Sequence, residues 1–295
     1  MFRGGERGGN LTSKPSAQEG PQTATPTMNI VVCVKHVPDA TGDLNFEEDN
    51  TVDRVGVDGL LSELDEYAVE QALQIKEKSS GEGDSADAVT VTALCVGPEG
   101  AADAVRKALQ MGADQAVHVV DDAIAGSDAI ATSLVLAGAI NKIGSVDLVI
   151  CGMASTDGAM SVVPAMLAER LDLPQVTLAS VIESQGDQIR IKRDGDAATE
   201  VIGATLPVVL SVTDQTDEAR YPSFKGIMAA KKKPLETWSL ADLGVDAGQV
   251  GLGAAYTAVE ETAARPPRTA GEIVTDEDGS GAKALAEFLA SKKFI

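Results

Sequence analysis

Short apolar runs alternate with longer amphipathic stretches along the first half of the chain. The apolar runs have the length of β-strands and cover residues 29–35, 88–96, 115–119 and 146–150. The stretches between them carry apolar residues at helical spacing and cover residues 62–78, 99–111 and 128–143. Strands that alternate with helices in this way predict an α/β fold built on a doubly wound, mostly parallel sheet.

The pattern changes after Pro174, where strand-like segments follow one another with little helix between them. These segments cover residues 175–184, 188–193, 200–203 and 207–212, and Gly186-Asp187 is typical of a hairpin turn. We expect them to extend or back the same sheet.

The two ends of the chain lack the composition of a folded core. Residues 1–27 are rich in Gly, Ser, Pro, Thr and Gln, so we expect a disordered leader or a start assigned too early, with Met28 as the native start. Residues 28–235 then form the α/β domain, and residues 236–295 form an extended C-terminal arm. The arm ends in a short amphipathic helix over residues 282–291, which rests either on its own domain or on a partner subunit.

Composition narrows the classes of function. The formal net charge of −21 argues against nucleic-acid binding and favours basic partner surfaces. The three cysteines form no CxxC pair and lie in or beside strand-like runs, as expected for reduced thiols of a cytoplasmic protein. Two histidines far apart argue against a histidine-based metal site, and no apolar run has the length that membrane insertion requires.

One loop has the composition of a ligand site. Residues 151–161 follow the apolar run 146–150 and lead into helical spacing over residues 162–171, with Ser161 as the expected N-cap and Pro164 in the first turn. Free backbone N–H groups and the positive end of a helix dipole bind anions, so the loop is either a seat for a nucleotide phosphate or an ordinary βα loop. Geometry alone favours the ordinary loop, because every α/β fold has several such loops. The loop carries neither the Rossmann fingerprint nor the P-loop glycine pattern.

A second stretch, residues 218–233, stands out from the acidic background. It carries Phe224 on a segment broken by Pro222 and Gly226, and it ends in three consecutive lysines. A charge run is usually a solvated face, but its position in an acidic chain favours docking of a partner. No GxSxG, His-containing triad or HExxH pattern occurs, so the residues alone predict an acidic α/β nucleotide-binding protein without its own catalytic residues.

Four motifs, in order along the chain, resemble the beta (small) subunit of electron transfer flavoprotein. They are residues 30–39 (IVVCVKHVPD), 63–72 (ELDEYAVEQA), 106–114 (RKALQMGAD) and 220–233 (RYPSFKGIMAAKKK). The resemblance extends from Met28 to Ile295. It implies an adenine nucleotide alpha hydrolase-like fold and an electron carrier instead of an enzyme.

The resemblance also implies cofactors and partners. In this family an alpha subunit holds a redox FAD, and the beta subunit binds a structural AMP and covers part of the flavin. Acyl-CoA and related dehydrogenases of fatty acid oxidation deliver electrons, and a membrane quinone reductase accepts them. The arm, residues 236–295, is then expected to pack on the alpha subunit.

The family's contacts fall on particular residues of this chain. The cofactor-binding contacts fall on Cys33, Ser62, Glu63, Leu64, Asp65, Val96, Gly152, Thr156, Asp157, Gly158, Ala159, Met160, Ser161, Val162 and Val163. The partner-docking contacts fall on Tyr221, Phe224, Lys225, Ile227 and Met228, with Phe224 at the position of an anchoring leucine. Asp194 stands where the family often has a glutamate that steadies the mobile flavin domain.

Two alternatives stay open. In an electron-bifurcating relative, a second FAD replaces AMP at the same loop. An adenine-nucleotide-binding stress or signalling module, or a nucleotide hydrolase of similar fold, explains the loop but neither the lysine-rich stretch nor the arm.

Overall fold

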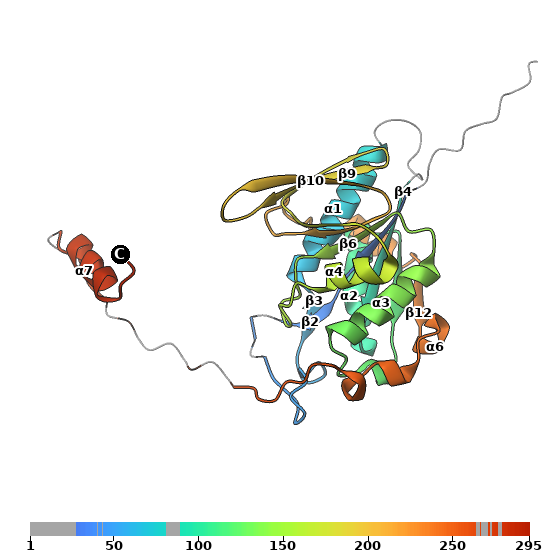
Figure 1. Ribbon diagram of the computed structural model, residues 1–295, viewed down its shortest axis with the longest axis horizontal. Helices are drawn as coiled ribbons and strands as arrows, with labels where there is room; N and C mark the ends of the chain where they lie inside the picture. Colours follow the sequence, from blue (N-terminus) through green and yellow to red (C-terminus); the bar gives the residue numbers. More distant parts are fainter. Residues whose placement is uncertain are drawn as a thin grey trace, which may run out of the picture. The chain divides into compact units, whose positions relative to one another are not determined.

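Seven parallel strands form the central sheet, in the order β12-β5-β4-β1-β6-β11-β7. Helices surround these strands (Figure 1). The bounds of the strands are β1 Met28–Cys33, β4 Val89–Val96, β5 Gln115–Val119, β6 Leu148–Gly152, β7 Gln175–Ala179, β11 Val208–Val212 and β12 Leu235–Trp238. β1 lies in the middle and pairs with β4 on one side and β6 on the other. This arrangement confirms the α/β class and the doubly wound, mostly parallel sheet.

The computed structural model describes residues 28–39, 41–42, 44–80, 89–263, 266, 271, 273–276 and 279–295. The expected leader, residues 1–27, lies outside the described residues. The chain divides into two units, one ending at Val259 and the other running from Glu260 to Ile295.

Helices cover both faces of the central sheet. α1 (Glu63–Ser80) and α2 (Ala102–Met111) pack on one face, and α3 (Ala129–Ile143) and α4 (Val163–Leu171) pack on the other. Successive side chains of β1 point to opposite faces, so Ile30 and Val32 belong to the first cluster and Val31 to the second, all fully buried. A strand buried on both faces requires apolar residues at every position, which explains the uninterrupted apolar runs in the sequence.

A second, antiparallel sheet contains β8 (Val181–Gln185), β9 (Gln188–Asp194) and β10 (Thr199–Thr205). Its isoleucines Ile182, Ile189 and Ile191 join the buried cluster on the α1 and α2 side, so this sheet backs the central one as expected. The single strand predicted over residues 175–184 is wrong, because the structure divides it between the two sheets. Leu178 adopts a left-handed backbone with φ of 61°, which breaks the extended conformation there.

The first unit extends further along the chain than the sequence suggests. Residues 235–238 form the edge strand β12, which pairs with β5, and α6 (Leu240–Leu243) follows it. Leu240 and Val250 are buried in the cluster on the α3 and α4 side. The boundary expected between residues 235 and 236 therefore lies later, after Val259. The second unit contains α7 (Gly281–Ser291), close to the predicted C-terminal helix.

The remaining elements are short. They are β2 (His36–Pro38), β3 (Gly59–Leu61), α5 (Phe224–Ala230) and the 3₁₀ turns η1 (Glu99–Ala101), η2 (Asp122–Ile124), η3 (Ala247–Gln249) and η4 (Leu252–Ala254). Among the described residues, no helix combines the length and apolarity needed to cross a membrane.

The order of the strands marks where a ligand site is expected. The chain passes from β1 to β4 and β5 on one side, and then crosses to β6 on the other side of β1. Such a reversal opens a crevice at the carboxyl ends of the two strands, where ligands of open α/β sheets bind. Cys33 ends β1 and Gly152 ends β6, so both lie at this edge.

Candidate functional site

The loop between β6 and α4 leaves the sheet at this switch point. α4 begins at Val163 with Val162 as its N-cap, and no side chain caps it. The prediction that Ser161 is the N-cap is wrong. Ser161 lies one residue before the cap, and its φ of 58° is left-handed. Pro164 lies in the first turn of the helix, as expected.

The backbone of this loop is strained where it meets the helix. Ala159 and Ser161 both have positive φ, at 49° and 58°, which is uncommon for residues with a Cβ atom. Strain of this kind clusters at ligand sites, where it orients backbone groups. The N–H groups of Met160–Val163 have no hydrogen-bond partner among the described residues. They are therefore available to an anion at the positive end of the helix dipole.

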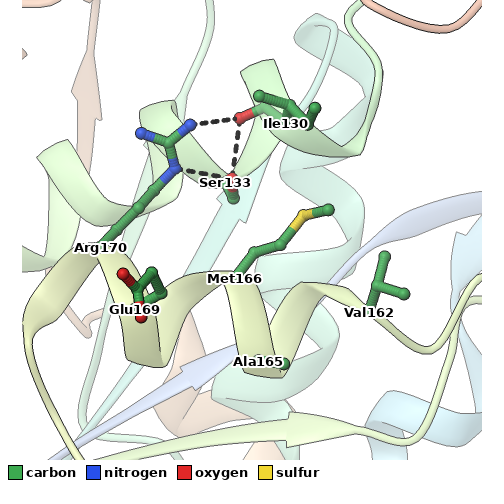
Figure 2. A pocket seen from close by; sticks show the side chains of 7 residues that line it. All are labelled: Ile130, Ser133, Val162, Ala165, Met166, Glu169 and Arg170. Atoms are coloured by element: carbon green, nitrogen blue, oxygen red, sulfur yellow. Dashed lines mark hydrogen bonds between the residues drawn. The ribbon is translucent and has the colours of Figure 1, made fainter.

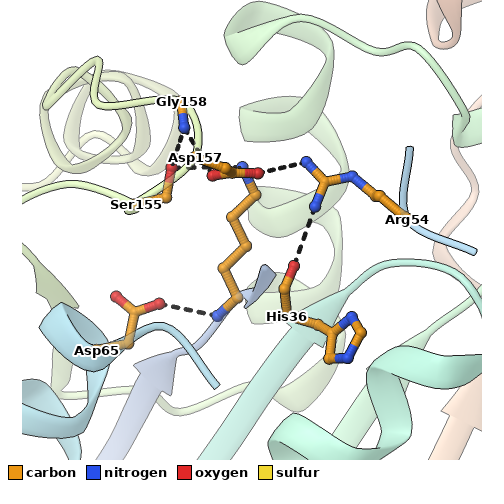
Figure 3. Close-up of polar contacts among 7 residues, drawn as sticks. His36, Arg54, Asp65, Ser155, Asp157 and Gly158 are labelled. Atoms are coloured by element: carbon orange, nitrogen blue, oxygen red, sulfur yellow. Dashed lines mark hydrogen bonds and ion pairs between the residues drawn. The ribbon is translucent and has the colours of Figure 1, made fainter. Parts of the chain in front are cut away.

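Two cations converge on one carboxylate of the loop (Figure 3). The Lys35 ammonium lies 2.9 Å from Asp157 Oδ1, and Arg54 Nη2 lies 2.5 Å from Asp157 Oδ2. Arg54 also donates to the carbonyl oxygen of His36, at 3.2 Å. Burial opposes the charge of Asp157, but the two cations outweigh it and hold the pKa of this carboxyl far below its usual range. The cluster keeps one positive charge in excess.

The start of α1 lies directly against the end of β6. The Lys35 N–H donates to Asp65 Oδ2 at 2.9 Å, and the Gly152 N–H donates to the same carboxyl group. Burial nevertheless raises the pKa of Asp65 to about 7. A Cβ atom on Gly152 would lie 2.5 Å from Asp65 Oδ1 and 2.7 Å from the Leu64 carbonyl oxygen. Only glycine therefore allows β6 and α1 to approach this closely.

One buried hydroxyl in this region lacks a partner. Ser62 is fully buried at the start of α1, and its Oγ has no hydrogen-bond partner among the described residues. Buried hydroxyls without partners are rare in native proteins. Together with the free N–H groups of Met160–Val163, this atom fits a site completed by a polar ligand.

The structure brings the predicted cofactor-binding residues to one edge of the sheet. Cys33 and Val96 end the neighbouring strands β1 and β4. Gly152 ends β6 and packs against Leu64 and Asp65 in the first turn of α1. Sequence reasoning missed the two charged contacts, Lys35 and Arg54. Lys35 stands in the first family motif, and Arg54 is an isolated cation in an acidic segment, which is the signal that was available.

A separate hollow of about 480 Å³ lies between α3 and α4 (Figure 2). Its lining includes Met166, Ala165 and Val162. Arg170 lines it as well, and its guanidinium donates to Ser133 Oγ at 2.8 Å and to the Ile130 carbonyl oxygen at 3.0 Å. These bonds link α4 to the first turn of α3. The hollow is mostly apolar and shares only Val162 with residues 156–163.

The predicted docking residues lie on and before α5. Tyr221 and Phe224 are 86 % and 82 % exposed, and Ile227, Met228 and Lys225 are exposed as well. We call residues Tyr221–Met228 the docking segment. The lysine run behind it is not uniformly solvated, because Lys233 donates to the Leu109 and Ala113 carbonyl oxygens at the end of α2.

Comparison with known proteins relates this chain to a family. The family model of the Electron transfer flavoprotein domain matches residues 49–243. The Electron transfer flavoprotein subunit beta of Mycobacterium tuberculosis (strain ATCC 25618 / H37Rv) is 46 % identical over 268 residues, which cover 90 % of this chain and 99 % of the relative. The chain belongs to the electron transfer flavoprotein family.

More distant relatives agree. The Electron transfer flavoprotein subunit beta of Megasphaera elsdenii is 33 % identical, covering 85 % of this chain and 93 % of the relative. The protein named Caffeyl-CoA reductase-Etf complex subunit CarD from Acetobacterium woodii is 34 % identical, covering 90 % and 97 %. The chain is accordingly a beta subunit of an electron transfer flavoprotein. Membership implies an alpha-subunit partner, a flavin and the role of an electron carrier.

Proposed function

We propose that this beta subunit binds AMP at the carboxyl edge of its sheet, helps to enclose an FAD held by the alpha subunit, and docks partner dehydrogenases so that their electrons pass to that FAD. The AMP phosphate lies against residues 156–163. The observation that carries the proposal is the group of unpartnered N–H groups of Met160–Val163, on a strained loop at the switch point. A helix N-terminus of this kind suits a phosphate.

The local charge supports an anionic ligand. Two cations, Lys35 and Arg54, face one ionised carboxylate, Asp157. Burial raises the pKa of the nearby Asp65 to about 7, so near neutrality this carboxyl is only partly ionised and does not cancel the excess positive charge. The loop is thus a positive point in a chain with a net charge of −21.

Nucleotide analysis of the purified alpha–beta complex tests this proposal. Denaturation should release AMP in an amount equal to the complex, together with one FAD. Lys35→Met should lower AMP affinity about tenfold, because a charge-assisted contact is lost. Lys107→Met is the matched control, since Lys107 is 38 % exposed and paired with Glu66, and Lys35 is 40 % exposed and paired with Asp157.

The outcomes separate the alternatives. A complex that releases no adenine nucleotide besides one FAD contradicts the proposal. Two FAD molecules per complex with no AMP favour the electron-bifurcating alternative. An equal loss of AMP in the Lys35 and Lys107 variants places the phosphate elsewhere.

Partner docking and the electron path complete the proposal. The docking segment offers exposed apolar side chains, among which Phe224 is the anchor for acyl-CoA and related dehydrogenases. FAD, when bound by the alpha subunit, supplies the redox chemistry, and a membrane quinone reductase is the acceptor. The carrier acts in the cytoplasm. Asp194 steadies the mobile flavin domain, and its own carboxylate accepts hydrogen bonds from Ser180 and Thr199.

The C-terminal unit supplies a contact with the alpha subunit. α7 exposes Leu285 and Phe288, which are 59 % and 54 % accessible, and Phe294 and Ile295 behind them are exposed too. Exposed apolar residues gathered on one short helix indicate a covering surface. We assign this cover to the alpha subunit, while residues up to Val259 fold with the sheet.

A further inference from the structure

The residue immediately before the docking segment is held by a fork of ion pairs. Arg220 Nε lies 2.7 Å from Glu70 Oε2, and Arg220 Nη2 lies 2.9 Å from Glu70 Oε1. The remaining guanidinium edge contacts Glu77, at 2.5 Å and 3.1 Å. The Arg220 backbone N–H also donates to Glu70 Oε2 at 3.1 Å. Main chain and side chain of Arg220 are therefore both fixed to α1.

The partners of Arg220 differ in burial. The Glu70 side chain is 6 % exposed and also accepts a hydrogen bond from Gln74, whereas the Glu77 side chain is 59 % exposed. A buried carboxylate needs its counter-ion, so the Glu70 contact is fixed in place. A planar guanidinium satisfies two carboxylates at once, which an ammonium group does not.

The chain that follows the docking segment and α5 is also attached, at the end of α2. The Lys233 ammonium donates to the Leu109 and Ala113 carbonyl oxygens, at 2.9 Å and 2.6 Å, where α2 ends. Cations are favourable at a helix C-terminus. Between the two anchors, α5 lies against α2 and is capped by Ser223, whose Oγ accepts from the Gly226 N–H.

We propose that Arg220 is a positioning residue for electron delivery, because its fork to Glu70 and Glu77 holds the docking segment preformed for a dehydrogenase. The inference rests on the docking role proposed above. α5 has seven residues and is too short to be stable as an isolated helix. Without the fork, the segment samples other conformations, and only the competent fraction binds. The fork thus lowers the conformational entropy that the docking segment loses when a dehydrogenase binds.

Steady-state kinetics of the complete alpha–beta complex, with an acyl-CoA dehydrogenase as electron donor, tests the proposal. Arg220→Lys keeps the charge but removes the fork. Its KM for the complex should rise about three- to tenfold with kcat unchanged, as expected when the competent fraction falls. Arg193→Lys is the matched control, because Arg193 is 32 % exposed, Arg220 is 33 % exposed, and Arg193 donates two N–H groups to Glu200 on β10.

A double variant shows whether Arg220 acts through Phe224. If it does, Arg220→Lys combined with Phe224→Ala raises KM no further than Phe224→Ala alone. Amide hydrogen exchange of residues 221–230 should also rise in Arg220→Lys and not in Arg193→Lys. Glu77→Gln, with Glu200→Gln as control at 59 % and 58 % exposure, repeats the test without disturbing the buried carboxylate.

The results distinguish failure of the positioning role of Arg220 from failure of the docking role. The positioning role is refuted if Phe224→Ala raises KM and Arg220→Lys does not, or if the two effects multiply in the double variant. If Phe224→Ala leaves KM unchanged, the docking segment is wrongly assigned and the positioning role of Arg220 fails with it.

Discussion

Asp65 is a buried carboxyl group whose protonation links the candidate site to pH. Its pKa is raised by burial from 3.8 to about 7. Between these values the folded protein holds a proton that the unfolded chain has lost, so the stability from this group is complete below pH 4 and decreases as the pH rises through 7. The steepest loss is about 1.4 kcal/mol per pH unit.

Asp65→Asn should remove this dependence. We expect the melting temperature of the variant complex, relative to the original, to improve progressively between pH 5 and pH 8. Thermal unfolding at several pH values in that range measures the difference, in which the contributions of other groups cancel. Parallel curves for the two proteins would show that Asp65 does not titrate in this interval.

Phe224 is the exposed aromatic side chain proposed as the anchor for the dehydrogenase. Phe224→Ala should weaken the dehydrogenase complex by about 2 kcal/mol, because buried aromatic anchors dominate interfaces. Flavin content and melting temperature should stay unchanged, since the side chain is 82 % exposed in the subunit. Tyr256→Ala, at a position 84 % exposed outside the segment, is the control. Lower thermal stability with normal flavin reduction would identify Phe224 as a packing residue.

The sequence indicates which loop forms the candidate site but not which charged side chains contact that loop. The position of residues 151–161 after an apolar strand follows from local pattern, and the structure places them at the switch point. Lys35 and Arg54 meet Asp157 across separations of 122 and 103 residues, so no local pattern predicts the contacts. The left-handed Ser161 was missed because serine is a common N-cap, which made it the expected cap of α4.

The end of β6 packs so closely against the start of α1 that residue 152 has no room for a side chain. Gly152→Ala should destabilise the first unit by about 1–3 kcal/mol and lower nucleotide content, because the methyl group meets backbone and a buried carboxylate. Gly100→Ala, where an added Cβ meets nothing within 4 Å, should have little effect. Melting temperatures and nucleotide content of both variants provide the measurement. Equal stability would mean that the two elements separate readily.

Elements buried on both faces were predictable, and those held by distant partners were not. β5 has the bounds that its apolar run indicates, Gln115–Val119. β12 was missed because its four residues, LETW, are partly exposed and gain their place only from pairing with β5. The division of residues 175–184 depends on the left-handed Leu178, whose N–H donates to Ser211 Oγ on the neighbouring strand β11.

At the scale of the whole molecule, the position of the unit boundary determines which truncation is informative. A chain ending at Val259 should keep the sheet and its nucleotide but bind the alpha subunit more weakly, because α7 and its exposed Leu285 and Phe288 are lost. Co-purification with the alpha subunit and thermal unfolding provide the measurement. Undiminished affinity would show that the second unit, from Glu260 to Ile295, makes no contact with the alpha subunit. A chain ending at 235 should instead be unstable, since it lacks Leu240 and Val250 of the core.

The pairing of β12 with β5 also has a consequence for synthesis. The ribosome releases β5 long before residues 235–238, so the growing chain carries β5 as an open edge with unpaired backbone groups on one side. An open edge is a template for pairing with another polypeptide. Full-length chains close it with their own late strand. Chains that end before Leu235 keep this edge open, and we expect them to self-associate through it.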